Sequence, residues 1–156
     1  MKFIPASGLL NRQESFYHES KSNQSQIDIY RNIIFILQQS HSLEFDFSKM
    51  SIIILILYTT QLKLLQSLEK LMNSKTINSI KVATIDSRQN READIIMFCI
   101  IHCNVNDSIG FLTDERRMNV ALTRARRELI IVGHKETLVG SEEGGYFWKA
   151  WFQSLI

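Results

Sequence analysis

Short runs of apolar residues constrain the fold of this chain most strongly. SIIILILY at 51–58 and ADIIMFCII at 93–101 are almost uninterrupted, and shorter apolar segments occur at 79–86 and 128–134. Successive side chains of a strand point to opposite faces, so an unbroken apolar run indicates a strand that is buried on both faces. Such strands are typical of parallel sheets covered by helices on both sides.

Segments with helical spacing alternate with these strands. Helices are predicted at 27–40, 59–74, 113–127 and 146–156, either from apolar residues three and four positions apart, as one face of a helix requires, or from a capping residue. The expected cap is Thr59 or Thr60 in the second segment and Thr113 or Asp114 in the third. We therefore predict an α/β fold, with a parallel sheet covered by helices on both faces. The polar residues 1–22 are expected to form a weakly ordered lead-in, with a short edge strand at 15–18, before a single domain at 23–156.

The composition favours a globular protein without a metal centre. The net charge is only +2, so attraction to a polyanion must come from local patches. Cys99 and Cys103 are too few for a disulfide framework, and we interpret them as reduced thiols. The four histidines are scattered, at His18, His41, His102 and His134. No apolar run approaches the roughly 20 residues that a membrane span needs, so we expect a soluble nuclear or cytoplasmic protein with no membrane partner.

Five arginines crowd one segment that otherwise has the pattern of a core helix and strand: Arg116, Arg117, Arg124, Arg126 and Arg127. On a helix, Arg117 and Arg124 lie seven residues apart and project from nearly the same side. A guanidinium group is planar and permanently charged, which suits phosphate oxygens. These residues alone leave two interpretations open, a phosphate-facing surface and a solvated basic face.

A second polar cluster follows the predicted strand that ends at Asp86. Gln89, Arg91 and Glu92 occupy the turn before the next buried strand begins. In open parallel sheets the ligand crevice lies outside the carboxyl ends of the strands. Polar loops without a function are also common at strand ends, so this cluster alone does not identify a site.

Together the two segments resemble motifs V and VI of the superfamily 1 helicases. They read VATIDSRQNREADIIMFCIIHCN at 82–104 and IGFLTDERRMNVALTRARRELIIVGH at 109–134. The first is similar to the family's T-[VI]-D-x-x-Q-G-x-E stretch, and the second to I-G-F-L followed by R-R-x-N-V-A-L-T-R-A-[RK]. The branch that they resemble most is that of senataxin and the nonsense-mediated-decay helicases. More faintly, YTTQ at 58–61 resembles motif IV.

The resemblance implies the second, C-terminal RecA-like domain of an ATP-dependent RNA/DNA helicase. In that family ATP lies in a cleft between two such domains, and the first domain carries the phosphate-binding loop and holds Mg²⁺. Arg124, in LTRAR, would be the arginine finger that stabilises charge on the γ-phosphate. Glu92 matches the acidic residue of motif V that contacts the ribose.

The same resemblance assigns the remaining candidate residues. The nucleotide would have four more neighbours, Gln89, Arg117, Tyr58 and Gln61. Thr84 and Thr59 fall where the family touches the backbone of single-stranded RNA or DNA. Contacts of this kind hold a strand without reading its sequence.

The sequence also departs from the family. It has no G-x-x-x-x-G-K-[ST] loop and no acidic pair after an apolar strand, so these 156 residues alone are not expected to hydrolyse ATP. A first RecA-like domain would have to lie upstream or come from another chain. Three motif positions, which are proline, glycine and arginine in the family, are Leu57, Asn90 and His102. Two alternatives therefore stay open, an inactive nucleic-acid-binding or interaction module and a gene-fragment remnant.

Overall fold

A computed structural model gives the fold. The structure describes a set of segments and not the whole chain: residues 2–5, 15–17, 20–22, 24–39, 49–58, 61–63, 65–67, 80–88, 92–100 and 109–154.

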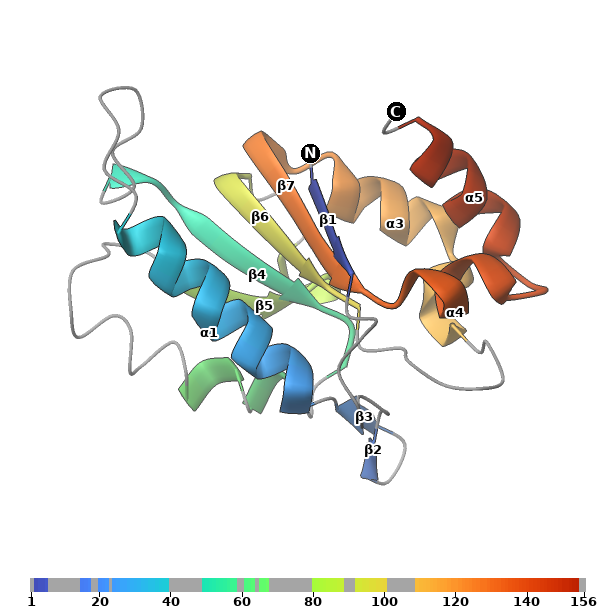
Figure 1. Cartoon of the computed structure of the whole chain (residues 1–156), viewed down its shortest axis with the longest axis horizontal. Helices are drawn as coiled ribbons and strands as arrows, with labels where there is room; N and C mark the ends of the chain where they lie inside the picture. The colour runs from blue at the N-terminus through green and yellow to red at the C-terminus, as the bar shows by residue number, and fades with distance from the viewer. Residues whose placement is uncertain are drawn as a thin grey trace.

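A five-stranded sheet, parallel throughout, forms the centre of the molecule (Figure 1). Its strand order is β1-β7-β6-β4-β5, so the chain adds strands on both sides of β4. The five strands are β1 (Lys2–Pro5), β4 (Ile52–Ile56), β5 (Ile80–Thr84), β6 (Ala93–Cys99) and β7 (Ala125–Gly133).

Helices cover both faces of this sheet, as the sequence predicted. Figure 1 shows α1 (Gln24–Gln39) on one side of the sheet. On the other side lie α3 (Glu115–Leu122), α4 (Lys135–Gly140) and α5 (Gly145–Gln153). In β4, alternate side chains point to opposite faces and all five residues are buried. The unbroken apolar run therefore arises because this strand has no solvent-facing side.

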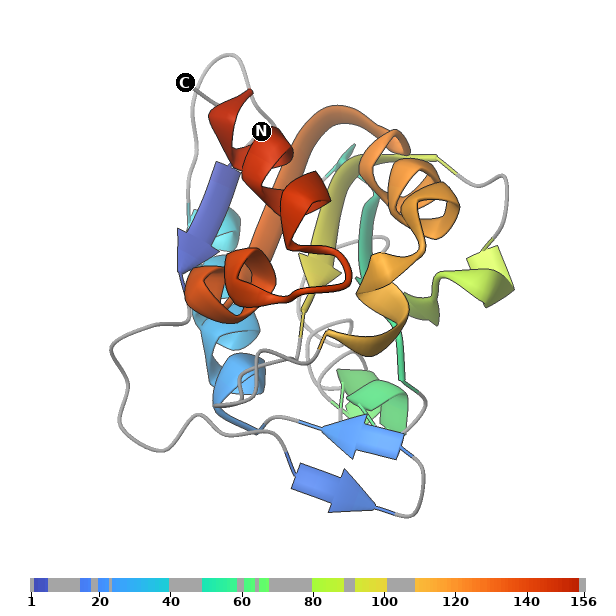
Figure 2. The ribbon, with the colours of Figure 1, turned by 90° about the vertical axis from the view of Figure 1, so that its right-hand side faces the viewer.

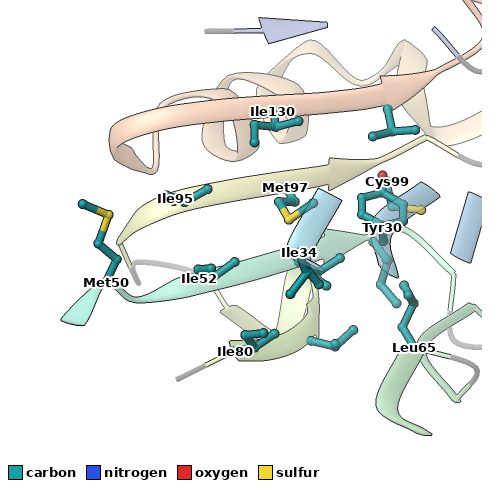
Figure 3. Close-up of a cluster of buried hydrophobic side chains, with 14 of the residues drawn as sticks. Tyr30, Ile34, Met50, Ile52, Leu65, Ile80, Ile95, Met97, Cys99 and Ile130 are labelled. Carbon is teal, nitrogen blue, oxygen red and sulfur yellow. The ribbon is translucent and has the colours of Figure 1, made fainter. Parts of the chain in front are cut away.

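Each face has its own core. On the α1 side, Tyr30 and Ile34 pack on alternate residues of β4, β6 and β7 (Figure 3). On the opposite side, Met118 of α3 and Trp148 of α5 pack on the other set, which includes Phe98 of β6. Both cores are almost purely apolar, so polar groups with a function are confined to the sheet edges and the helix ends.

The arginine-rich segment differs from its prediction. We expected a helix over 113–127, but α3 ends at Leu122 and β7 begins at Ala125. Arg126 and Arg127 therefore lie on a strand. Thr123 closes the helix, because its hydroxyl donates to the carbonyl of Asn119 (2.7 Å), and Ala125 then pairs with Ala93 of β6. This long-range pairing overrides the good helix propensity of arginine.

The N-terminal region also differs in part. The predicted edge strand at 15–18 is present as β2 (Ser15–Tyr17), which pairs antiparallel with β3 (Ser20–Ser22) in a separate sheet. Lys2–Pro5, however, belongs to the main sheet as β1, parallel to β7. The polar, irregular composition of residues 1–22 had indicated a lead-in outside the domain. The remaining residues of 1–14 lie outside the described part of the chain.

The other predicted elements agree where they are described. Within 59–74, residues 61–63 and 65–67 are helical, and Leu65 packs in the α1-side core. The predicted helix at 146–156 is α5, and α4 was not predicted. In the part of the chain that the structure describes, no helix is long and apolar enough to span a membrane.

Candidate functional site

The point where the strand order reverses lies between β4 and β6. The helical residues after β4 pack on one face and α3, before β7, packs on the other, so these two connections diverge on either side of the sheet. Ligand crevices in such sheets open outside the carboxyl ends of the strands at this point. Tyr58, two residues beyond β4, and Thr84, the last residue of β5, lie at this carboxyl edge.

An aromatic and charged cluster occupies the carboxyl edge beside Tyr58. The short 3-10 helix η3 (Gly110–Thr113) brings Phe111 to 6.0 Å from Tyr58, measured between ring centroids. The guanidinium carbon of Arg117, in the first turn of α3, lies 5.3 Å from the centroid of the Phe111 ring. We name Tyr58, Phe111 and Arg117 the carboxyl-edge cluster.

Two acids fix the orientation of Arg117. Its Nε lies 3.6 Å from Oδ1 of Asp86 and 3.5 Å from Oδ2 of Asp114. Asp114 is the N-cap of α3 and is one of the two caps that the sequence predicted. Its Oδ1 accepts hydrogen bonds from the backbone N–H groups of Arg116 and Arg117. Arg117 therefore connects the start of α3 to the segment after β5, which Figure 2 shows beside α3.

Thr84 lies in a tight turn at the end of β5. Its hydroxyl oxygen accepts from the backbone N–H of Ser87 (3.2 Å), and its carbonyl accepts from the Ser87 hydroxyl (3.0 Å). The turn leads into the short 3-10 helix η2 (Asp86–Arg88). Thr84 remains partly exposed, so its side chain can be reached from solvent.

Gln61, which the resemblance assigns to the neighbourhood of the nucleotide, has a buried side chain. Its side chain is 0% exposed, and Nε2 donates to Sγ of Cys99 at 3.7 Å. The hydroxyl of Tyr30, from α1, donates to the carbonyl of Phe98, the residue before Cys99, at 3.1 Å. Figure 3 shows Tyr30 next to Cys99. Burial raises the pKa of the Cys99 thiol to about 12 and also raises the pKa of Tyr30. Gln61 thus ties the segment after β4 to the core.

Arg124 and Glu92 lie together at the opposite, amino edge of the sheet. The backbone N–H of Ala93, next to Glu92, donates to the carbonyl of Arg124 at 3.2 Å. Glu92 is exposed, whereas Arg124 is half-buried. The Nε of Arg124 is buried and has no hydrogen-bond partner among the described residues. An arginine donor left in this state is suited to an anionic ligand, because a buried unpaired donor is costly.

An aspartate–serine bracket fixes the amino edge. Oδ2 of Asp94 accepts from the backbone N–H (3.0 Å) and the hydroxyl (2.8 Å) of Ser51, and the Ser51 hydroxyl oxygen accepts from the Asp94 N–H (3.0 Å). Arg126 Nη2 and Arg127 Nε each lie 3.6 Å from Asp94 Oδ1. The hydrogen bonds from Ser51, helped by the two arginines, lower the pKa of Asp94.

The candidate residues therefore fall into two groups at the two ends of α3. Arg117 and Tyr58 lie at the carboxyl edge, with Thr84 at the end of the neighbouring strand. Arg124 and Glu92 lie at the amino edge. α3 runs from one group to the other, and its two turns rise on the order of 10 Å. Our expectation that Arg117 and Arg124 share a single helix was wrong, since Arg124 follows the end of α3.

Comparison with known proteins agrees with this arrangement. The model of the AAA domain family matches residues 3–136, which is most of the chain and includes both edges of the site. The chain belongs to the senataxin and nonsense-mediated-decay branch of the superfamily 1 helicases. Its all-parallel, helix-covered sheet is consistent with a RecA-like domain of that family.

Individual relatives are similar over different shares of the chain. The DNA polymerase alpha-associated DNA helicase A of Saccharomyces cerevisiae is 34% identical over 133 residues, 85% of this chain and 18% of that protein. The helicase sen1 of Schizosaccharomyces pombe is 44% identical over 82 residues, 52% of this chain and 5% of that protein. The regulator of nonsense transcripts 1 of Dictyostelium discoideum is 49% identical over 67 residues, which are 43% of this chain and 5% of that protein. This chain thus spans a small part of each helicase.

Several helicase motif positions lie outside the described residues: Thr59, Gln89, Asn90 and His102. Leu57, in place of the motif IV proline, is half-buried and packs against both cores. Among the described residues, no group of three or more His, Cys, Asp or Glu side chains could hold a metal ion.

Two features of the site were missed in the sequence. The first is Phe111 of the IGFL segment, whose apolar neighbours in the sequence do not distinguish an exposed ring from a core residue. The Ser51–Asp94 bracket joins residues 43 positions apart, and no local pattern marks such a pair.

Proposed function

We propose that this chain is the second RecA-like domain of an ATP-dependent RNA/DNA helicase. It would supply an arginine finger and backbone contacts to a single strand, while a first RecA-like domain brings the phosphate-binding loop and holds Mg²⁺. The observation that carries the proposal is Arg124, whose buried Nε lacks a partner among the described residues. It lies at the motif VI position of a chain that belongs to this helicase family.

The surroundings of Arg124 suit a role toward a phosphate. The carbonyl of Arg124 accepts a hydrogen bond from the backbone N–H of Ala93. Arg126 and Arg127 are paired with Asp94, each with a nitrogen 3.6 Å from Oδ1. Among the described residues, no carboxylate forms an ion pair with the Arg124 side chain. Its guanidinium would stabilise negative charge on the γ-phosphate, an effect of about 10³–10⁵ in rate for arginine fingers in general. Glu92, exposed on the adjacent strand start, would accept from the ribose hydroxyls.

The carboxyl edge would contact the nucleic acid. Thr84 is partly exposed at the end of β5, where a hydroxyl can donate to a phosphate oxygen, and Thr59 would act similarly. Arg117 is paired with two carboxylates, which suits a supporting role better than a direct phosphate contact. Such contacts fix a strand without selecting its sequence.

The altered motif positions favour a second candidate, a nucleic-acid-binding module that does not support ATP turnover. Asn90 replaces a glycine, and His102 replaces an arginine. Asparagine tolerates a positive φ better than most residues, so the loop can keep the family's conformation. The two candidates differ in one measurable property, which is strand-stimulated ATP hydrolysis in the presence of a first domain.

A domain exchange tests the proposal. The segment of the yeast DNA polymerase alpha-associated DNA helicase A that matches this chain is replaced by this chain, and strand-stimulated ATP hydrolysis is measured. We expect turnover in the exchanged protein and its loss, by about a thousandfold or more, on changing Arg124→Ala. Arg116→Ala is the matched control, because Arg116 is an exposed arginine of α3 that plays no part in the proposed site.

The possible results separate the candidates. Turnover that depends on Arg124 and not on Arg116 supports the helicase role. An exchanged protein that binds strands but never hydrolyses ATP supports the binding module. Hydrolysis that survives Arg124→Ala refutes the arginine-finger assignment.

A further inference from the structure

Phe111 is an exposed aromatic residue in the middle of the carboxyl edge. Its side chain is 53% exposed, although η3 also carries Leu112, which is fully buried. Gly110 has a φ of 50°, a left-handed conformation that glycine adopts at little cost. This backbone turn directs Leu112 to the core and leaves the Phe111 ring at the surface.

Among the described residues, charged side chains lie beside Phe111 in addition to the ring of Tyr58. Arg117 lies over its ring, and Asp86 and Asp114 lie next to Arg117. The cores of protein–protein interfaces are depleted of aspartate, so a ring whose arginine neighbour is paired with Asp86 and Asp114 fits poorly with a protein partner. A flat ring supported by a guanidinium plane does fit a nucleobase, because bases stack on aromatic rings and on arginine.

We propose that Phe111 is a stacking platform for an unpaired base of single-stranded RNA or DNA. This inference rests on the proposed function, because it needs a strand that crosses the carboxyl edge. Thr84 would hold the strand by its phosphates, and Phe111, backed by Arg117 and Tyr58, would receive a base. Stacking on a ring tolerates any sequence, as a translocating domain requires.

The two ion pairs of Arg117 support a role beside the ring and not at a phosphate. Asp86 and Asp114 balance the charge of the guanidinium, which lies over the Phe111 ring. The Tyr58 ring is buried to 8% exposure and inclined at 49° to Phe111. Phe111 therefore has fixed neighbours, and binding a base would require little reordering of side chains.

The test compares strands with and without bases. The full chain is titrated with a fluorescently labelled single-stranded oligonucleotide and with an abasic strand of the same length, at several salt concentrations. We expect the base-bearing strand to bind more tightly, and Phe111→Ala to weaken it about tenfold while leaving the abasic strand unaffected. Phe111→Tyr should retain the wild-type affinity, because a ring remains.

Salt dependence distinguishes stacking from phosphate contact. Each lost phosphate contact lowers the slope of log affinity against log salt, whereas the loss of stacking shifts the line without changing its slope. Phe111→Ala should therefore give a parallel line. Phe35→Ala is the matched control, since Phe35 is 54% exposed on α1, on the opposite face, and should bind as the wild type does.

Three results would overturn the inference. Equal binding of both strands by the wild type, or an unchanged affinity in Phe111→Ala, refutes the platform while strand binding itself still supports the proposed function. If the wild type binds neither strand, the nucleic-acid part of the proposed function fails together with this inference.

Discussion

Removing the carboxylate of Asp94 should destabilise the chain more than its position near the surface suggests. Asp94 is 21% exposed, and its Oδ2 accepts two hydrogen bonds from Ser51, at 3.0 and 2.8 Å. Each hydrogen bond to a charged group contributes about 1.5–3 kcal/mol. Ser51 is half-buried and can rebind water in part, so the lower end of that range applies.

The nearby arginines add little to this sum. Arg126 and Arg127 are more than half exposed and lie 3.6 Å from Asp94, and exposed ion pairs contribute about 0–1 kcal/mol. Asp94→Ala should therefore lower the free energy of unfolding by about 3 kcal/mol, nearly all of it from the Ser51 bracket. Asp94→Asn keeps an accepting oxygen and should lose about half as much.

Urea denaturation followed by circular dichroism measures these differences. Asp86→Ala is the control, because Asp86 is also an aspartate paired with an arginine at 3.6 Å but is 61% exposed; we expect a change of about 0.5 kcal/mol or less. If Asp94→Ala unfolds at the same urea concentration as Asp86→Ala, the bracket does not stabilise the chain and our reasoning is wrong.

The effect of Asp94 should also depend on pH in a defined direction. Its pKa is lowered in the folded chain, so the stabilisation is complete above the pKa of an unfolded aspartate, about 3.9. It is lost as the pH falls through the lower, folded pKa. The difference in unfolding free energy between the wild type and Asp94→Asn should therefore narrow as the pH falls below about 4. A difference that stays constant would contradict the charged form of the bracket.

Two further changes test the packing around the site. Gly145→Ala should lower the free energy of unfolding by about 2 kcal/mol, because a Cβ there would lie 2.6 Å from the Val139 carbonyl oxygen; Gly140→Ala, at an exposed position, should be nearly neutral in the same urea titration. In a Cys103→Ser background, Cys99 should resist a thiol reagent at neutral pH until the chain unfolds, because burial raises its thiol pKa to about 12. Labelling faster than global unfolding would show that the Gln61–Cys99 contact opens in the folded state.

Much of the fold could be predicted from the sequence, because the central strands β4 and β6 are buried on both faces. β4, β5 and β6 were located by their apolar runs, and the alternation with helices correctly gave the parallel sheet. Asp114 was correctly expected as one of two possible caps of α3. Such features depend on neighbours within a few residues, which is the range over which periodicity and capping act. β1 was not predicted, because its pairing with β7 joins residues more than a hundred positions apart in the chain.

For the site, the sequence by itself determined which residues carry the helicase motifs, and therefore that Arg124, Arg117 and Glu92 are candidates. Only the tertiary structure decided where they lie. β7 pairs with β6 from Ala125 onward, so α3 ends before Arg124, whose Nε is buried. The segment after β4 packs so that the Gln61 side chain is buried against Cys99. The same packing leaves Phe111 exposed beside Arg117. Burial and strand pairing join residues far apart in the chain, so the physical state of each side chain was fixed by contacts that no local pattern records.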